Sequence, residues 1–226
     1  MSRSQTAPTV TTVSEYAGQE TVRVKATQLG NAYTDAQARR VVSEWQEFLA
    51  AGPSPIRELE FVSRTPRRLF EALGGQTQLH ALNVKWGDYA DLTPLTGMTE
   101  LRTLYLRGAS GVEDLTPLGG MVGVQDLQVE GLRRVHDLAP VGGMSGVTSL
   151  ELGGDWMTPR TLHVASIGFL QQMPQLRQLL LHTLAVDDLD YSAILELPNL
   201  TSVRVMEVRG MRPSLADLRA QTPWSA

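Results

Sequence analysis

One pattern of apolar and polar positions, apolar-x-x-apolar-x-apolar, occurs seven times along the chain, with copies starting at residues 56, 79, 101, 124, 147, 176 and 200. Neighbouring copies start 22 to 29 residues apart, a period that indicates a solenoid of stacked repeats. The alternating apolar residues of each copy point to one side of a short strand. Because one repeat cannot bury its apolar face alone, the pattern predicts strands stacked into a parallel sheet over a continuous apolar core. The copies are Ile56/Leu59/Phe61, Leu79/Leu82/Val84, Leu101/Leu104/Leu106, Val124/Leu127/Val129, Val147/Leu150/Leu152, Leu176/Leu179/Leu181 and Leu200/Val203/Val205.

A second motif follows the strands of repeats two, three and four. It reads Asp91-Leu92-Thr93-Pro94-Leu95, Asp114-Leu115-Thr116-Pro117-Leu118 and Asp137-Leu138-Ala139-Pro140-Val141. With these motifs the chain resembles bacterial leucine-rich-repeat proteins, and the central repeats resemble the internalin subclass, whose repeat carries an Asp-apolar-x-Pro-Leu turn. The likeness covers roughly residues 56 to 210. It implies an α/β fold, a curved, right-handed leucine-rich-repeat solenoid with a parallel β-sheet on the concave side and turns and short helices on the convex side.

The chain departs from this family at one position. The family usually places an asparagine three residues past the last apolar strand position, where its side chain binds backbone along the stack. Here Gly87, Ala109, Leu132 and Asp155 occupy that place. We therefore expect no asparagine ladder.

The two ends of the repeat region should be closed by caps. Thirty of the 32 leucines lie after residue 55, so residues 19–55 are expected to form an α/β N-terminal cap, preceded by a mobile tail over residues 1–18. Thr34 and Gln37 fit a capping box at the start of a helix over residues 35–50. Residues 20–25 alternate like a strand, with which residues 9–16 could pair. Residues 211–226 are expected to form a C-terminal cap and tail with one short helix.

Prolines indicate which repeats carry helices on the outer wall. Thr65-Pro66 precedes a helical pattern over residues 67–73, and Thr158-Pro159 precedes another over residues 160–172. Repeats one and five should therefore carry convex helices. Repeats two to four should have only tight turns there.

Composition restricts the possible chemistry. The chain has no cysteine, which excludes disulfides, thiolate metal sites and cysteine nucleophiles. Its net charge of -4 argues against a nucleic-acid partner, because phosphate neutralisation needs a basic face. No apolar run has the length of a membrane span, and the first residues do not form the apolar core of a signal peptide. We therefore expect a cytoplasmic protein, monomeric, with neither nucleic-acid nor membrane partners.

Neither the histidines nor the glycine runs predict a catalytic, metal or phosphate site. His80, His136, His163 and His182 do not occur at the close spacings of metal ligands, and His80 and His182 fall at strand positions that should face solvent. The glycine runs at 119–123 and 142–146 lack the Lys-Ser/Thr of a phosphate loop and recur one repeat apart, as corners of the stack do. No Gly-x-Ser-x-Gly motif is present. The expectation is a chain that is no enzyme and has no cofactor or metal.

The candidate binding residues lie on the exposed positions of the strands and on the rim of the sheet. The middle exposed positions of the seven strands are Glu60, Asn83, Tyr105, Gln128, Glu151, Leu180 and Arg204. We predict that the partner-binding residues are Lys85, Trp86, Arg102, Tyr105, Arg107, Gln128, Glu130, Glu151, Trp156, Leu180, His182 and Arg204. Patches of both charge signs with aromatic residues beside arginine favour a protein partner over a nucleic acid.

The preferred hypothesis is a non-catalytic module that binds a protein partner through the concave face. A toxin-neutralising immunity protein or an effector-like protein would use the same binding physics in a specialised context. A purely structural module and an enzyme with no recognisable motif remain as alternatives from other classes.

Overall fold

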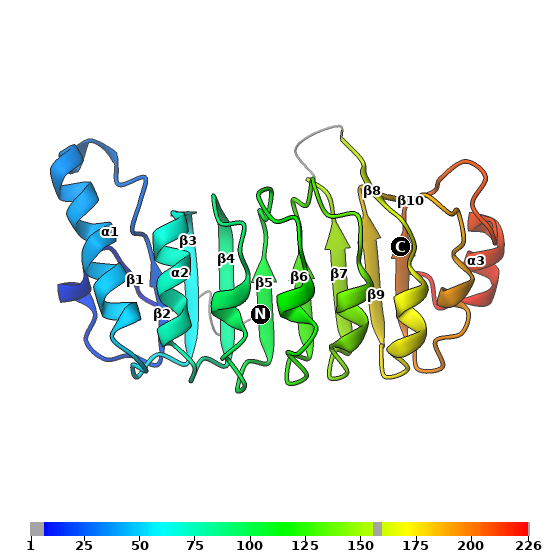
Figure 1. The fold of residues 1–226 in the computed structure, drawn as a ribbon, viewed down its shortest axis with the longest axis horizontal. Coiled ribbons are helices and arrows are strands. Elements are labelled where there is room, and N and C mark those ends of the chain that lie inside the picture. Colours follow the sequence, from blue (N-terminus) through cyan, green and yellow to red (C-terminus); the bar gives the residue numbers. More distant parts are fainter. Residues whose placement is uncertain (1–6, 156–159, 226) are drawn as a thin grey trace.

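The structure is a computed structural model that describes residues 7–155 and 160–225. Within these residues, nine strands form one parallel sheet in the order β1-β2-β3-β4-β5-β6-β7-β9-β11 (Figure 1). Their bounds are β1 (Thr9–Val10), β2 (Thr21–Val24), β3 (Glu58–Thr65), β4 (Ala81–Gly87), β5 (Thr103–Leu106), β6 (Asp126–Val129), β7 (Ser149–Gly153), β9 (Gln178–His182) and β11 (Ser202–Val205). The seven repeats supply β3 to β7, β9 and β11, which confirms the predicted stack.

The strand pairing also confirms the predicted register. Leu82, Leu104 and Leu127 are neighbours in one row that continues through Leu150 and Leu179. None of these five side chains is more than 2% exposed. The buried row lies under the 3-10 helices that connect the strands, so each repeat covers the leucines of its neighbours.

The second motif forms the turns of the outer wall. Oδ1 of Asp91, Asp114 and Asp137 accepts a hydrogen bond from the backbone N–H two residues later, at 2.8 Å in each case. These Asx turns lead into the short helices η5 (Thr93–Leu95), η6 (Thr116–Leu118) and η7 (Ala139–Gly143). Repeats two to four therefore carry tight turns, as predicted.

The two predicted convex helices differ in outcome. In repeat one, α2 (Arg67–Glu71) and η4 (Ala72–Gly75) follow β3, with Pro66 as the N-cap residue and Thr65 still in the strand. In repeat five the prediction of a helix over 160–172 is wrong for its first half. Residues 162–164 form β8 (Leu162–Val164), which pairs with β10 (Leu184–Val186), and only η8 (Gly168–Gln172) is helical. Thr158 and Pro159 lie outside the described residues.

The N-terminal cap is built on α1 (Asp35–Ala50). The predicted capping box is present, since Thr34 and Gln37 bind each other's backbone N–H groups. Trp45 is fully buried, and its Nε1 donates to the carbonyl of Thr11 at 2.8 Å. Residues 9–10 form β1, which pairs parallel with β2. This confirms the expected pairing with residues 20–25, and it shows that the expectation of a mobile tail is wrong for these residues, so the ordered cap includes residues before 19. The cap also contains η2 (Val13–Glu15) and η3 (Gly30–Ala32).

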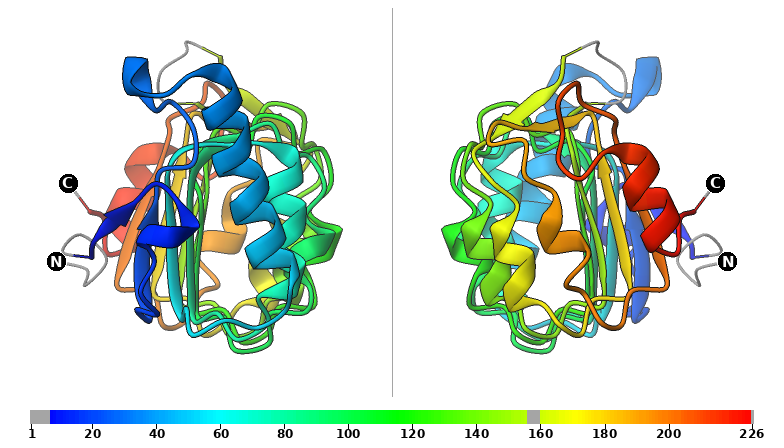
Figure 2. Two further views of the ribbon diagram at one scale, coloured as in Figure 1. Left: turned by 90° about the vertical axis from the view of Figure 1, so that its left-hand side faces the viewer. Right: turned by 90° about the vertical axis from the view of Figure 1, so that its right-hand side faces the viewer.

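The outer wall of repeat six carries η9 (Ser192–Ile194), and the C-terminal cap contains α3 (Leu215–Gln221) and a last segment that pairs with β11. Val203 donates its N–H to Pro223 and accepts from the N–H of Ser225, both at 3.0 Å. Seen end-on, α3 lies on the side of the sheet opposite to α2 and the 3-10 helices (Figure 2). Among the described residues, no helix is both long and apolar enough to cross a membrane.

Candidate partner-binding surface

The predicted exposed positions form one row across the sheet. The row lies on the face away from α2 and the 3-10 helices, which we call the open face. Strand pairing places its members side by side in the order Glu60, Asn83, Tyr105, Gln128, Glu151, Leu180 and Arg204. Arg204 is exposed and the other six are half-buried. The row therefore presents side chains from seven strands on one surface.

At the N-terminal end of the row the polar groups bind one another. Glu60 accepts hydrogen bonds from Arg23 at 3.0 Å and from Asn83 at 3.4 Å. Lys85 and Trp86 are exposed near the end of β4, and Trp86 is 39% exposed. Trp86 is thus an exposed apolar side chain within β4, where it pairs with Arg64.

Tyr105 is at the centre of the row. Its hydroxyl donates to the carboxylate of Asp126, and the guanidinium carbon of Arg107 lies 5.3 Å from its ring centroid. Partial burial and the hydrogen bond to Asp126 raise the pKa of Tyr105 well above its ordinary value, so the phenol stays neutral. The pair presents an oriented aromatic ring beside a cation.

Glu130, Glu151 and His182 meet next to this centre. They come from three neighbouring repeats, and one ligand atom from each lies within 4.8 Å of the other two. Gln128 donates a hydrogen bond to Glu130, and Nε2 of His182 lies 3.3 Å from Oε1 of Glu151. The expectation of no metal site rested on spacing along the chain, which does not reveal clusters that form between repeats.

The prediction that His182 faces solvent is wrong, because its side chain is only 4% exposed. The cause is Gly153, which pairs with His182 in the neighbouring strand. A Cβ atom at position 153 would lie 2.3 Å from Cε1 of His182. The imidazole therefore occupies the volume that a side chain would fill in another repeat.

One predicted residue does not contribute to this face as expected, and another lies outside the described residues. Nη1 of Arg102 donates to the carbonyls of Thr99, Leu101 and Gly123 at 3.2 to 3.3 Å, so its guanidinium connects the corners of two repeats below the strands. Trp156 lies outside the described residues.

The C-terminal end of the open face is hollowed by two adjoining pockets that both contact Leu180 and Arg204. One, of about 340 Å³, is also lined by Leu215, Arg219 and Trp224 from the C-terminal cap. The other, of about 260 Å³, is lined with polar groups that include Glu151. The guanidinium carbon of Arg219 lies 5.0 Å from the ring centroid of Trp224.

Sequence reasoning missed the contribution of the C-terminal cap to this surface. The short helix α3 was predicted, but no periodic pattern indicates on which side of the sheet it packs. Its contact with the open face follows from the course of the chain after β11.

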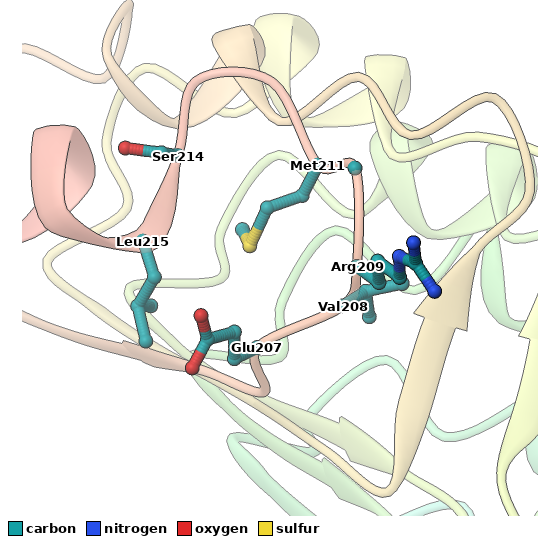
Figure 3. Close-up of a pocket in the computed structure, with 7 residues that line it drawn as sticks. Glu207, Val208, Arg209, Met211, Ser214 and Leu215 are labelled. Atoms are coloured by element: carbon teal, nitrogen blue, oxygen red, sulfur yellow. The ribbon is translucent and has the colours of Figure 1, made fainter.

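A further hollow of about 500 Å³ lies inside the loop between β11 and α3 (Figure 3). Met211 points into it, whereas Arg209 points away from Glu207, so the charged groups do not converge there (Figure 3). This hollow is a weaker candidate for a binding site than the open face.

No protein-family model matches the chain, and no curated protein matches it. Solved structures do. Internalin InlF of Listeria monocytogenes superposes with a TM-score of 0.55 at 17% identity, over 85% of this chain and 51% of that one. Internalin C2 of the same species gives 0.50 at 21% identity, over 71% of this chain and 64% of that one. The ectodomain of the Arabidopsis thaliana receptor kinase GASSHO1/SCHENGEN3, in complex with CASPARIAN STRIP INTEGRITY FACTOR 2, gives 0.50 at 17% identity, over 66% of this chain and 18% of that one.

The chain spans less than two thirds of each of these proteins. At such identities the likeness concerns the fold. Together with the repeat register and the parallel sheet, it shows that this chain has the fold of leucine-rich-repeat solenoids.

Proposed function

We propose that the chain is a non-catalytic module that binds a protein partner through the open face. One observation carries this proposal: Tyr105 and Arg107 lie together at the centre of the row. Asp126 holds the Tyr105 ring through a hydrogen bond, and the Arg107 guanidinium lies beside the ring. Aromatic and arginine side chains at the centre of an interface contribute most of the binding energy in many complexes. A ring that is already oriented loses little conformational entropy on binding.

The charge pattern supports a protein partner. Acidic side chains at the centre of the face, Asp126, Glu130 and Glu151, are followed at the C-terminal end by Arg204 and Arg219. Nucleic acid would need one basic surface, whereas alternating patches match a partner with complementary charges. The 340 Å³ pocket beside Leu180 and Trp224 has room for an apolar side chain of that partner.

Alanine substitution of the two central residues tests the proposal. A partner is first isolated by affinity capture from the lysate of the source organism. The Kd of its complex with this chain is then measured by calorimetry. Tyr105→Ala and Arg107→Ala should each weaken binding by about 2 kcal/mol or more. Tyr105→Phe, which keeps the ring, should weaken binding less.

Arg68→Ala serves as the control and should leave the Kd unchanged, because Arg68 is an exposed residue of α2, on the opposite side of the sheet from the open face (Figure 2). Melting curves of each variant separate a loss of binding from a loss of folding. Binding that survives both central substitutions but is lost in Arg68→Ala would contradict the proposal. The identity of the captured partner distinguishes a toxin-neutralising role from an effector-like one.

A further inference from the structure

The cluster of Glu130, Glu151 and His182 combines an imidazole nitrogen with two carboxylates at metal-ligand spacing. The three residues lie on or directly after β6, β7 and β9, which are consecutive in the sheet. Each offers one ligand atom, and the three atoms all lie within 4.8 Å of one another. The parallel register fixes this arrangement, because Gly153, two residues after Glu151, pairs with His182.

His182 is held in an orientation that suits a metal ligand. Its side chain is 4% exposed and lies against the backbone of Gly153. Nδ1 lies 2.9 Å from the hydroxyl oxygen of Thr183, while Nε2 faces Glu151. Metal-binding histidines usually make such a hydrogen bond through the ring nitrogen that does not bind the metal, which fixes the tautomer and the ring plane.

The carboxylates are also held in place by neighbours. Gln128 donates its amide N–H to Glu130, and the Glu151 side chain is only 25% exposed. Two carboxylates brought together on a half-buried surface repel each other. A bound divalent cation would offset this repulsion.

We propose that Glu130, Glu151 and His182 bind a divalent cation of the zinc type on the open face. One imidazole and two carboxylates form a mixed nitrogen and oxygen donor set of the kind that zinc accepts. Three protein ligands leave a coordination position for water or for a side chain of a partner. The proposal does not depend on the protein-binding function, since the cation would bind to the free chain.

Calorimetric titration of the metal-stripped full chain with zinc chloride tests this site. Saturable binding of one zinc ion per chain is expected, together with a rise in melting temperature, because the ion binds the folded state. Glu151→Gln and Glu130→Gln should each weaken the zinc affinity at least tenfold. His182→Gln should abolish the saturable binding of one zinc ion per chain.

His80→Gln is the matched control, because His80 is an exposed histidine whose Nε2 lies 3.0 Å from Glu100. It should leave zinc binding unchanged. If His182→Gln fails to fold, the two glutamine variants of the half-buried carboxylates decide the question. The absence of saturable zinc binding to the parent chain, or zinc binding that persists in both Glu151→Gln and Glu130→Gln, would overturn the proposal.

Discussion

A single glycine determines whether one side chain of the open face is buried or exposed. Lys85, Arg107, Glu130, Gly153 and His182 occupy the same position of successive repeats, two residues after the middle of the strand. The side chains before Gly153 extend over the face, whereas the imidazole of His182 fills the volume left beside the glycine. The burial of a residue in a solenoid therefore depends on its counterpart in the neighbouring repeat.

This close contact predicts the effect of adding one methyl group. Gly153→Ala would place Cβ 2.3 Å from Cε1 and 2.4 Å from the carbonyl oxygen of His182. Rotation of the imidazole cannot relieve the contact with the backbone, so we expect the free energy of unfolding to fall by about 1 to 3 kcal/mol. Denaturant unfolding measures this change.

Gly120→Ala is the matched control, because a Cβ atom at that position meets nothing within 4 Å. It should leave stability within about 0.5 kcal/mol of the parent. Equal stability of the two variants would show that the packing of β7 against β9 differs from the one described.

Contacts between neighbouring repeats determine which features of the open face follow from the sequence and which do not. The repeat register predicted which residues would share the open face, because strand alternation and repeat length determine it. It did not predict that Asp126 binds Tyr105 or that His182 is buried, since both depend on contacts between repeats. For the burial of His182, the glycine at position 153 was the one signal in the sequence.

At the level of single elements, the outer wall is organised by short aspartate turns. The hydroxyl of Thr93 and its backbone N–H bind Asp91, and those of Thr116 bind Asp114, which lowers the pKa of both carboxyls. Because hydrogen bonds favour the charged form, each turn is more stable when its aspartate is ionised. The same turn recurs at Asp190, where the side chain and backbone of Ser192 lower the carboxyl pKa.

These lowered pKa values predict a pH dependence of stability. An aspartate whose pKa is lowered in the folded state contributes stability above its unfolded pKa of about 3.9, and the contribution is lost as the pH falls through the folded value. The double variant Asp91→Asn/Asp114→Asn keeps an acceptor in each turn but cannot titrate. Its melting temperature should be below that of the parent at pH 7.

Melting curves between pH 7 and pH 2.5 should show this difference shrinking below about pH 4, where the parent carboxyls become protonated. A difference that stays constant over the whole range would mean that the charge of these aspartates does not stabilise the turns.

The elements differ in how well they could be predicted. The turns of repeats two to four recur with nearly the same residues, so each copy supports the prediction of a turn in the other two. The outer wall of repeat five has no counterpart, and its strand β8 is only three residues long. Its pairing with β10 joins segments of two different repeats, which a local helical pattern cannot reveal.

For the whole molecule, the two ends of the sheet are the places where it could pair with a second copy. A terminal strand has unpaired N–H and C=O groups that can pair with another chain. At the C-terminal end, residues 222–225 cover β11, and Trp224 packs partly buried against the core. This segment both caps the sheet and lines the 340 Å³ pocket of the open face.

Removal of residues 222–226 should therefore expose the edge of β11. The deletion removes the backbone hydrogen bonds between Val203 and both Pro223 and Ser225, together with the Arg219–Trp224 contact. We expect concentration-dependent association in sedimentation velocity experiments, because the freed edge can pair with a second copy. Trp224→Ala, which keeps the backbone pairing, should associate no more than the parent while losing one side chain that lines the pocket. If the deletion variant associated no more than the parent and kept its melting temperature, the last segment would not be what protects the edge of the sheet.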